Sequence, residues 1–161
     1  MHAENPAITI RLAAAEEAGA ILALTQAAFA VHELLDPPSS VFEETEADVR
    51  QAMIDGDILV AERNGALAGV ARVHPLPEQD ALYCGRLAVA PNLHGHGIGS
   101  ILTDAVERLA SERGYPAVVL GVRVQLVRNI QFFVKRGYML TGEHSHPGYA
   151  HPTYVRFRKN L

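Results

Sequence analysis

The stretch at residues 87–100 reads LAVAPNLHGHGIGS, and it is the part of the sequence that decides the fold. Its apolar first half is typical of a strand that ends at Pro91, and residues 98–113 continue as an amphipathic helix. Gly95, Gly97 and Gly99 stand between the two. Glycine permits positive φ angles and close approach of a ligand to the backbone. Because the first amides of a helix lack partners and its dipole favours negative charge there, the arrangement predicts an anion cradle, with pyrophosphate as the natural ligand.

Two other nucleotide-binding loops fit this stretch less well. A Walker loop ends in Gly-Lys-Ser/Thr, and no lysine is near these glycines. A dinucleotide fingerprint that begins at Gly95 needs glycine where Ser100 stands, and it follows the first strand of a parallel unit rather than a hairpin. The structural alternative is a glycine-rich turn that only packs a helix on a sheet. The agreement of strand, loop and helix disfavours that alternative.

The rest of the chain predicts an α/β (α+β) fold, in which helices flank a mixed sheet. Strands are expected at residues 7–12, 57–63, 66–74, 82–90, 116–122, 138–143 and 153–158. Helices are expected from about residue 16 to the prolines at 37 and 38, and at residues 45–56, 98–113 and 129–136. Asn64-Gly65 predicts a tight hairpin, and Thr45 with Asp48 a capping box. Pro75 and Pro77 are expected to end the second strand of the hairpin. One domain over residues 1–161 is expected.

Composition excludes several classes of protein. The 161 residues are 48% hydrophobic and 20% charged, which is typical of a globular domain. A net charge of −4 argues against a nucleic-acid partner, and the short basic run Arg156, Arg158, Lys159 is interpreted as a solvated strand face. The single cysteine, Cys84, is expected to be inert packing. One cysteine, no signal-peptide pattern and no long apolar stretch together predict a cytoplasmic protein without a membrane partner.

Two motifs together resemble the GNAT superfamily of N-acetyltransferases. The loop His94-Gly95-His96-Gly97-Ile98-Gly99 resembles the family's Arg/Gln-x-x-Gly-x-Gly/Ala segment, which follows a Leu-x-Val-x-Pro strand. Residues 129–138, NIQFFVKRGY, resemble its Asn…Phe-Tyr-x-Lys-x-Gly-Phe helix. The order of expected elements is similar over nearly the whole chain. The resemblance implies the GNAT fold, whose mixed and mostly antiparallel sheet is splayed at the CoA site.

The resemblance also implies an activity: transfer of the acetyl group of acetyl-CoA, the cosubstrate, to a primary amine of a small molecule by direct attack in a ternary complex, without a metal. The pyrophosphate would lie on the loop amides, and the pantetheine arm would pair with the backbone of the preceding strand. The Val89 amide would polarise the thioester carbonyl. Asn129 would lie near the pantetheine, and Phe132 and Phe133 beside the thioester. The implied cosubstrate-binding residues are Leu87, Ala88, Val89, His94, Gly95, His96, Gly97, Ile98, Gly99, Ser100, Asn129, Phe132 and Phe133.

Two residues depart from the family's pattern. His94 replaces the usual Arg or Gln; either it donates to phosphate, or it faces solvent with His96 while the backbone binds the phosphate. Phe133 replaces the frequent tyrosine general acid, and phenylalanine cannot donate a proton. Tyr83 is then a candidate catalytic residue for proton relay, with core packing an equal alternative, and Tyr138 is interpreted as a core aromatic. The missing tyrosine keeps a catalytically impaired CoA-binding sensor or regulatory domain open as the alternative function.

The remaining candidates concern the acceptor, the metal and the assembly. Glu33 and Asp36 fall where the family shapes its acceptor site, and their charge suits a cationic amine, although surface solvation explains either one alone. His144, His146 and His151 form no helical His-x-x-x-His pattern and have no close cysteines, so no metal site is predicted. A homodimer is compatible with the sequence. No motif identifies the acceptor.

Overall fold

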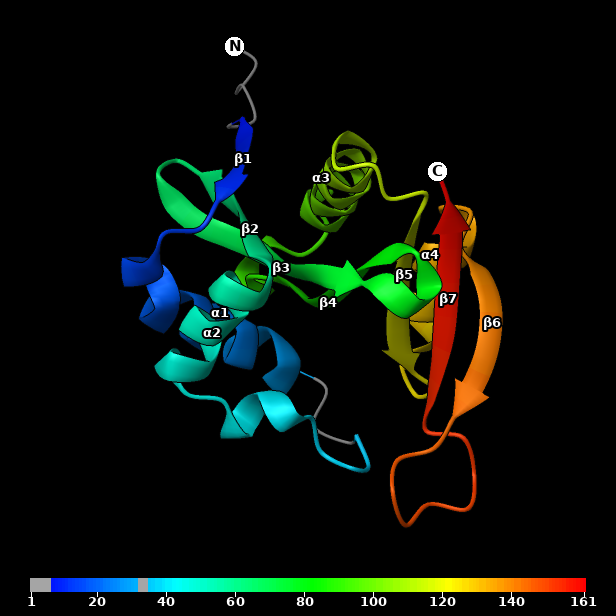
Figure 1. The fold of residues 1–161 in the computed structure, drawn as a ribbon. Helices are drawn as coiled ribbons and strands as arrows, with labels where there is room; N and C mark the ends of the chain where they lie inside the picture. The colour runs from blue at the N-terminus through cyan, green and yellow to red at the C-terminus, as the bar shows by residue number, and fades with distance from the viewer. Residues whose placement is uncertain (1–6, 32–34) are drawn as a thin grey trace.

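A computed structural model describes residues 7–31 and 35–161, which form a seven-stranded sheet with four α-helices (Figure 1). The strands are β1 (Ile8–Leu12), β2 (Asp57–Arg63), β3 (Ala66–Leu76), β4 (Ala81–Val89), β5 (Ala117–Arg123), β6 (Met139–His144) and β7 (Tyr154–Asn160). The helices are α1 (Ala18–Ala30), α2 (Glu46–Asp55), α3 (Ile98–Glu112) and α4 (Val127–Lys135). Short 3-10 turns precede α1 and α2 and follow β3 and β4.

The sheet has the strand order β1-β2-β3-β4-β5-β7-β6. Every neighbouring pair is antiparallel except β4 and β5, which are parallel. Parallel neighbours need a crossover connection, and α3 supplies it. The predicted α/β architecture with a mixed, mostly antiparallel sheet is therefore confirmed.

Helices cover both faces of the sheet. In Figure 1, α1 and α2 lie on one side and α3 on the other; α1 contacts β3 and β4, α2 contacts β2 and β3, and α3 contacts the strands from β1 to β5. The core beneath α3 also buries Phe133 of α4 and the adjacent Tyr138. A second core, beneath α1 and α2, contains Ile21, Val49 and Val60. Both helix layers are thus fixed to the centre of the sheet.

Local sequence signals lie where they were predicted, with small shifts at element ends. Asn64 and Gly65 have φ angles of 55° and 75° and make the turn between β2 and β3. The capping box of α2 is present: the Thr45 hydroxyl accepts from the Asp48 amide at 3.3 Å, and the Asp48 carboxylate accepts from the Thr45 amide at 2.8 Å. Helix α4 begins two residues earlier than expected, at Val127.

Strand β3 continues two residues past its expected end at His74, through Pro75 to Leu76, and ends directly before Pro77. Pairing of β3 with β2 ends at Val73, whereas pairing with β4 continues to the end of the strand. The strand therefore has an open edge at Pro75, which is where a sheet tolerates a residue without an N–H group. Within the described ranges, no helix combines the length and the apolar character that crossing a bilayer requires.

Candidate active site

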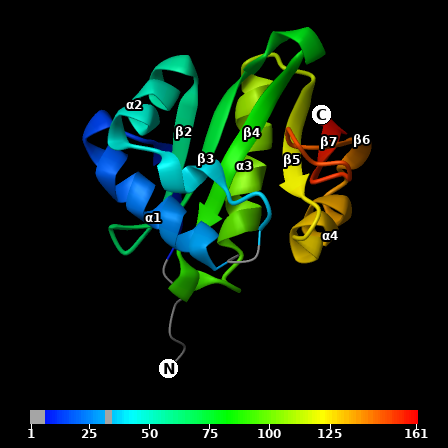
Figure 2. The same ribbon diagram turned by 90° about the horizontal axis from the view of Figure 1, so that it is seen from below.

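The sheet opens at its centre, between β4 and β5. The two strands pair only over residues 82–84 of β4 and 118–120 of β5. Past this point β4 continues to Val89 and β5 continues beside β7 to Arg123, and Figure 2 shows the two ends diverging. Residues 85–89 of β4 therefore have β3 on one side and no strand on the other. We call this opening the β4–β5 gap; its free strand edge can hydrogen-bond an added strand or a ligand arm.

A bulge in β4 sets which backbone groups face the gap. Arg86 and Leu87 lie opposite the single residue Ala71 of β3, and Arg86 has a positive φ of 49°. Farther along, the N–H of Ala90 donates to a β3 carbonyl at 2.8 Å. Successive residues of an extended strand turn their N–H and C=O groups to alternating sides. Val89 and Leu87 therefore turn theirs toward the gap, as the predicted pairing with a pantetheine arm requires.

The glycine loop at residues 94–97 lies at the end of β4 and leads into α3. Gly95 and Gly97 have φ angles of 84° and 75°, a conformation that favours glycine. The first hydrogen bond of α3 runs from the Ile101 amide to the Gly97 carbonyl at 3.1 Å, so the amides of residues 98–100 have no helical acceptor. A Cβ added to Gly95 or Gly97 would meet no atom within 4 Å. The loop has both the free amides and the open space of an anion cradle.

The two loop histidines are both exposed, and one of them contacts the preceding strand. His94 places its Nε2 atom 3.3 Å from the Val89 carbonyl oxygen, which ties the loop to the end of β4. His96 is exposed at the tip of the loop. His94 thus has a positioning contact in addition to the two roles that its sequence position suggested.

Gly69 of β3 sets how closely α3 approaches the sheet. A Cβ at this position would lie 2.9 Å from Leu102 Cδ1, 3.1 Å from Ile98 Cγ2 and 3.0 Å from the Ala88 carbonyl oxygen. These separations are shorter than ordinary contacts, so only glycine permits the observed packing. Because Gly69 has no side chain, the N-terminal part of α3 can pack closely on the sheet, next to the gap.

Helix α4 carries the other predicted cosubstrate-binding residues. Asn129 is exposed, and Phe132 is partly buried. Phe133 is 7% exposed, and its ring packs edge-on against Phe132 and Tyr138, at centroid distances of 5.0 and 5.4 Å. The Tyr138 hydroxyl donates to Glu107 of α3 at 3.2 Å. The interpretation of Tyr138 as a core aromatic is confirmed, since it is 3% exposed.

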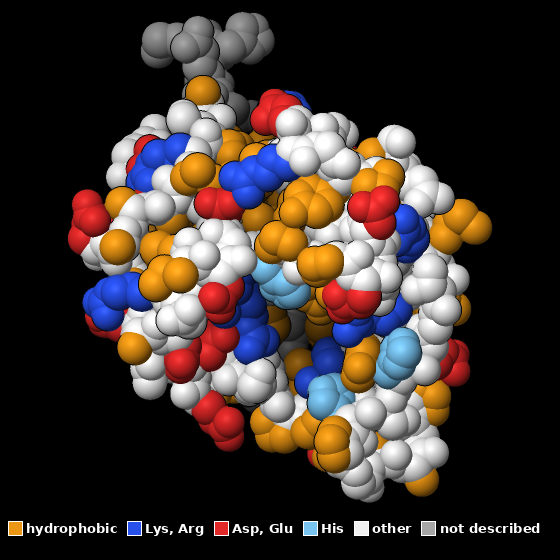
Figure 3. Space-filling view, in the orientation of Figure 1, with side chains coloured by type: hydrophobic (Ala, Val, Ile, Leu, Met, Phe, Trp, Pro, Cys, Tyr) orange, Lys and Arg blue, Asp and Glu red, His pale blue; other side chains and the backbone are white. Residues whose placement is uncertain are grey.

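A cavity of about 950 Å³ lies on the sheet face that carries α1 and α2. Its walls come from the end of α1, residues 35–40, α2, the strands β3, β4, β5 and β7, and the loop between β6 and β7. Figure 3 shows the molecule hollowed on one side, with Lys/Arg and His side chains gathered around the hollow. Tyr83, Gly85 and Arg86 of β4 line the cavity at the point where β4 leaves β5. The cavity and the gap therefore meet at β4.

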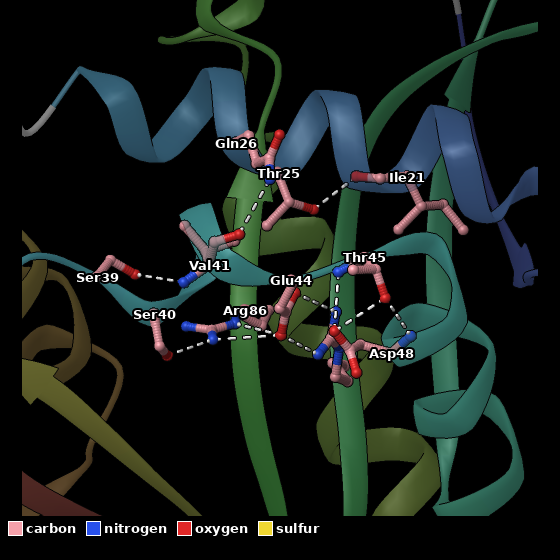
Figure 4. Close-up of polar contacts among 11 residues, drawn as sticks. Ile21, Thr25, Gln26, Ser39, Ser40, Val41, Glu44, Thr45, Asp48 and Arg86 are labelled. Atoms are coloured by element: carbon pink, nitrogen blue, oxygen red, sulfur yellow. Dashed lines mark hydrogen bonds and ion pairs between the residues drawn. The ribbon is translucent and has the colours of Figure 1, made fainter.

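Arginines dominate the charged lining of this cavity. They are Arg72, Arg86, Arg123 and Arg156. Glu44 lies between the first two: it accepts from Arg72 at 2.8 Å and from Arg86 at 3.3 Å, and Arg86 also donates to Ser40 at 2.9 Å (Figure 4). The lining acids, Asp48 and Asp55, are fewer than the arginines. Counted with Glu44 and with Asp36, which bonds the lining residue Tyr149, these acids equal the arginines in number. Among the described residues, Arg123 and Arg156 are the lining arginines without a carboxylate at ion-pair distance.

The sequence profile of the Acetyltransferase (GNAT) family matches residues 28–138, more than half of the chain. The chain belongs to the GNAT family of acetyltransferases. No curated protein matches the sequence.

Solved GNAT structures share this architecture from end to end. The PaiA N-acetyltransferase of Thermoplasma acidophilum, in complex with coenzyme A, is 16% identical with a TM-score of 0.78 and covers 96% of this chain and 99% of its own. The ribosomal-protein-S18-alanine N-acetyltransferase of Escherichia coli is 17% identical with a TM-score of 0.77, over 96% and 94%. A GNAT acetyltransferase of Elizabethkingia anophelis with acetyl-CoA bound is 19% identical with a TM-score of 0.71, over 99% and 100%. At these identities the likeness establishes the GNAT fold.

Tyr83 of this GNAT chain lines the cavity and also packs against the small core cluster of Ala81, Ala117 and Val119. It stacks on His74 at a centroid distance of 5.0 Å and an angle of 25°, and the Arg156 guanidinium lies 5.2 Å from its ring centre. Burial raises the pKa of Tyr83 above the ordinary value of 10, although Arg156 opposes the shift. The hydroxyl therefore stays protonated at neutral pH and can donate a proton. A Cβ at Gly121 would lie only 3.5 Å from this hydroxyl.

Other residues considered in the sequence analysis have surroundings that can now be described. Burial raises the pKa of the Cys84 thiol to about 12, which agrees with an inert cysteine. Asp36 accepts a hydrogen bond from the Tyr149 hydroxyl, and Glu33 lies outside the described residues. In the described part of the chain, no three His, Cys, Asp or Glu side chains gather where they could hold a metal ion. The His144 ring stacks on the Tyr154 ring at a centroid distance of 5.2 Å.

Sequence reasoning missed the arginine lining of the GNAT cavity. The interpretation of Arg156 as part of a solvated face is wrong, because β7 is an inner strand and this side chain enters the cavity. Its neighbours are engaged elsewhere: Arg158 donates to the Gln79 carbonyl at 2.7 Å, and Lys159 pairs with Glu107 at 2.7 Å. The alternation of cations along the strand was the available signal, but alternation alone does not say which face is covered.

Proposed function

We propose that this chain transfers the acetyl group of acetyl-CoA to the primary amine of a small molecule. One observation carries the proposal: the unpaired backbone of residues 85–89 connects the free amides at the start of α3 to the cavity on the other face of the sheet. A thioester held along this edge would present its carbonyl carbon where the cavity meets β4. The two reactants would then lie side by side, which supplies much of the rate of a bimolecular reaction.

The cosubstrate would lie along the gap. Its pyrophosphate would accept hydrogen bonds from amides of residues 94–100, where the dipole of α3 adds attraction. Its pantetheine arm would pair with the N–H and C=O groups of Leu87 and Val89. Asn129, Phe132 and Phe133 of α4 would contact the arm and the thioester from the other side. The structures of PaiA with coenzyme A and of the Elizabethkingia anophelis enzyme with acetyl-CoA support this choice of cosubstrate.

Two groups of β4 would assist the reaction. The amine nitrogen forms a bond to the acetyl carbon while the carbon–sulfur bond breaks, and the amine loses a proton to water. The Val89 amide would donate to the carbonyl oxygen as that oxygen gains negative charge. The Tyr83 hydroxyl, which burial keeps protonated by raising its pKa, would donate a proton to the departing sulfur. It would then regain a proton from the water that took the amine proton. No covalent enzyme intermediate is needed.

The size of the cavity supports a small acceptor. Its volume, about 950 Å³, falls within the roughly 300–1,000 Å³ of ordinary small-molecule sites. The family alone does not decide this point, because the Escherichia coli neighbour is named as an acetyltransferase of a ribosomal protein. We expect the wall formed by residues 35–40 and the β6–β7 loop to restrict longer acceptors.

A pair of glycine variants tests the cosubstrate site. Gly97→Val should weaken acetyl-CoA binding by about 10- to 100-fold, because a β-branched residue is strained at positive φ by roughly 1–3 kcal/mol and the loop must rearrange to relieve it. Gly114, at the opposite end of α3, has a φ of 80° and equally open surroundings. Gly114→Val is therefore the matched control for strain. Equal CoA affinities in the two folded variants, measured by calorimetry, would contradict the site.

One observation favours a second candidate function, a CoA-binding sensor or regulatory domain without turnover. Phe133 occupies the position of the family's frequent tyrosine acid and is buried against Tyr138. A sensor would bind acetyl-CoA with the same loop dependence but would release no CoA in the presence of amines. A thiol-release assay over a panel of primary amines separates the two functions, because only the transferase produces acceptor-dependent free CoA.

A further inference from the structure

The four arginines of the cavity differ in their carboxylate partners. Glu44 neutralises one charge of the pair Arg72 and Arg86. Neither Arg123 nor Arg156 has a carboxylate within ion-pair distance among residues 7–31 and 35–161. Both have a buried Nε atom without a hydrogen-bond partner in that part of the chain. Both side chains are only partly buried, so their guanidinium groups are accessible from the cavity. A guanidinium without a carboxylate partner at such a place is suited to an anion that arrives with a ligand.

The strand register brings the two guanidinium groups to the same face. On β5 and β7, Gly121 pairs with Arg156 and Arg123 pairs with Tyr154. Paired residues share a face of the sheet, so all four project to the cavity side. The Arg156 guanidinium lies 5.2 Å from the Tyr83 ring centre and 5.9 Å from that of Tyr154, held between two aromatic rings.

Arg123 faces more neighbours than Arg156 does. It donates to the Pro37 carbonyl, and burial lowers its pKa while Tyr149 and Asp36 partly offset that effect. Asp36 is itself hydrogen-bonded to the Tyr149 hydroxyl and makes no ion pair with Arg123. A guanidinium keeps its charge in any such setting. Arg156 is therefore the principal anion-binding candidate, and Arg123 is the second.

We propose that the acceptor is a small amine that also carries a carboxylate, and that Arg156, assisted by Arg123, binds this carboxylate. The inference rests on the proposed function, because it describes the acceptor of that reaction. The planar fork of a guanidinium matches a carboxylate through two parallel hydrogen bonds. A nearby guanidinium also favours the neutral amine over the ammonium ion, and only the neutral amine attacks a thioester. Asp36 and the undescribed Glu33 suggested a cationic acceptor from the sequence, whereas Arg123 and Arg156 favour an acceptor that also carries an anionic group.

Matched acceptor pairs test the proposal on the full chain. Each pair keeps the amine and replaces the carboxylate by a methyl group: β-alanine with propylamine, and γ-aminobutyrate with butylamine. We expect kcat/KM to favour the amino acid of at least one pair by about tenfold or more, the size of a charge-assisted hydrogen bond. Arg156→Gln should bring this ratio close to one, and Arg156→Lys should recover only part of it, because lysine lacks the fork.

Arg158→Gln is the matched control. Arg158 lies two residues along β7, does not line the cavity and bonds to Gln79 and Asn160. This variant should keep the wild-type ratio. If Arg156→Gln fails to fold, the wild-type ratio and the Arg156→Lys variant decide the question. A ratio near one for every pair, or an unchanged ratio in Arg156→Gln, would overturn the carboxylate proposal.

The remaining outcomes separate this proposal from the proposed function. Turnover of alkylamines and amino acids alike leaves the transferase intact and overturns the carboxylate site. Preference for phosphoethanolamine or for peptides over every amino acid also overturns it, in favour of a phosphate or a protein acceptor. If no amine is acetylated, the proposed function fails. Calorimetric binding of γ-aminobutyrate against butylamine to the CoA-loaded protein then still tests the carboxylate site by itself.

Discussion

The cosubstrate side of the proposed site consists mainly of backbone groups from one continuous stretch, residues 87–100, with side chains of α4 opposite them. The cavity side consists of side chains gathered from residue 29 to residue 156. On the first side the functional groups are amides and carbonyls, and the side chains matter mainly where they are missing. On the second side the functional groups are a tyrosine and a set of arginines on separate strands. The cosubstrate side therefore depends mainly on the backbone conformation of the loop. The cavity side depends on the identity of residues that are far apart in the sequence.

This difference determines how each side should respond to mutation. Changes in the loop or in the packing of α3 should alter the affinity for acetyl-CoA whatever the acceptor is. Changes in the cavity should alter turnover or acceptor selection and leave CoA affinity as it was. A cavity variant that changes CoA affinity, or a loop variant that changes acceptor selection, would show that the gap and the cavity are energetically coupled.

The largest effect is expected at Tyr83. Tyr83→Phe should lower kcat by about 100-fold, near the lower end of what general acid catalysis contributes, because a thiolate is already a good leaving group. Burial raises the pKa of Tyr83 above 10, so wild-type kcat should not lose this acid on the alkaline side until beyond pH 10. CoA affinity should stay unchanged if the two sides are separate. Steady-state rates and calorimetry on the same preparation measure both.

Tyr115→Phe is a suitable control for this substitution. Tyr115 follows α3 and packs on the core away from the cavity lining. It should retain wild-type kcat, which excludes a general effect of losing a phenol hydroxyl. If Tyr83→Phe keeps more than half of wild-type kcat, the phenol packs in the cavity without donating a proton, and the assignment of the acid is wrong.

A smaller effect is expected from two glycine-to-alanine changes, one on each side. Gly69→Ala forces a methyl group to within 2.9–3.1 Å of Leu102, Ala88 and Ile98, so α3 should shift. We expect a stability loss of about 1–3 kcal/mol and CoA affinity weakened by up to tenfold. Gly121→Ala meets its first neighbour, the Tyr83 hydroxyl, at 3.5 Å, an ordinary contact. It should raise the KM of the acceptor a few-fold and leave CoA binding unchanged.

The same two variants also test whether the cosubstrate side and the cavity side are independent. CoA affinity that falls in Gly121→Ala as much as in Gly69→Ala would mean that the cavity wall and the loop move together. Thermal melting separates either result from partial unfolding. Binding is measured well below the melting temperature of the less stable variant.

How much the sequence predicts follows from the same contrast. The loop was predictable because a strand, alternate glycines and a helix start leave a local pattern, and the structure has the expected φ angles at Gly95 and Gly97. The hairpin at Asn64 and the capping box of α2 were predictable for the same reason. The strand order and the bulge at Arg86 were not, since they depend on pairing across the chain.

The cavity could not be predicted because no local pattern distinguishes its residues. Arg156 and Arg158 alternate on β7, yet only the first lines the cavity. The second bonds to the turn after β3. That distinction depends on the pairing of Gly121 with Arg156 and on the Tyr83 ring that lies on the same face of the sheet. Neither can be inferred from the residues adjacent to Arg156 in the sequence. Asp36 illustrates the same limit, because its bond to Tyr149 joins segments more than a hundred residues apart.

The smallest change in rate is expected at Phe133, which lies on α4 at the boundary between the core and the proposed thioester site. Phe133→Tyr restores the family's frequent tyrosine but adds a hydroxyl to a ring that is 7% exposed and packed against Phe132 and Tyr138. A buried hydroxyl without a partner costs about 1–3 kcal/mol. With Tyr83 already able to donate a proton, kcat should change no more than a few-fold.

The effect of CoA on the stability of Phe133→Tyr shows whether residue 133 reaches the thioester. If it does, the sulfur of bound CoA gives the new hydroxyl a partner, and saturating CoA should raise the melting temperature of Phe133→Tyr more than that of the wild type. In the double variant Tyr83→Phe/Phe133→Tyr, part of the lost kcat should return, because the second phenol then supplies the proton. An equal CoA-induced shift in both proteins, together with no recovery in the double variant, would place Phe133 entirely in the core and leave α4 without a role in proton transfer.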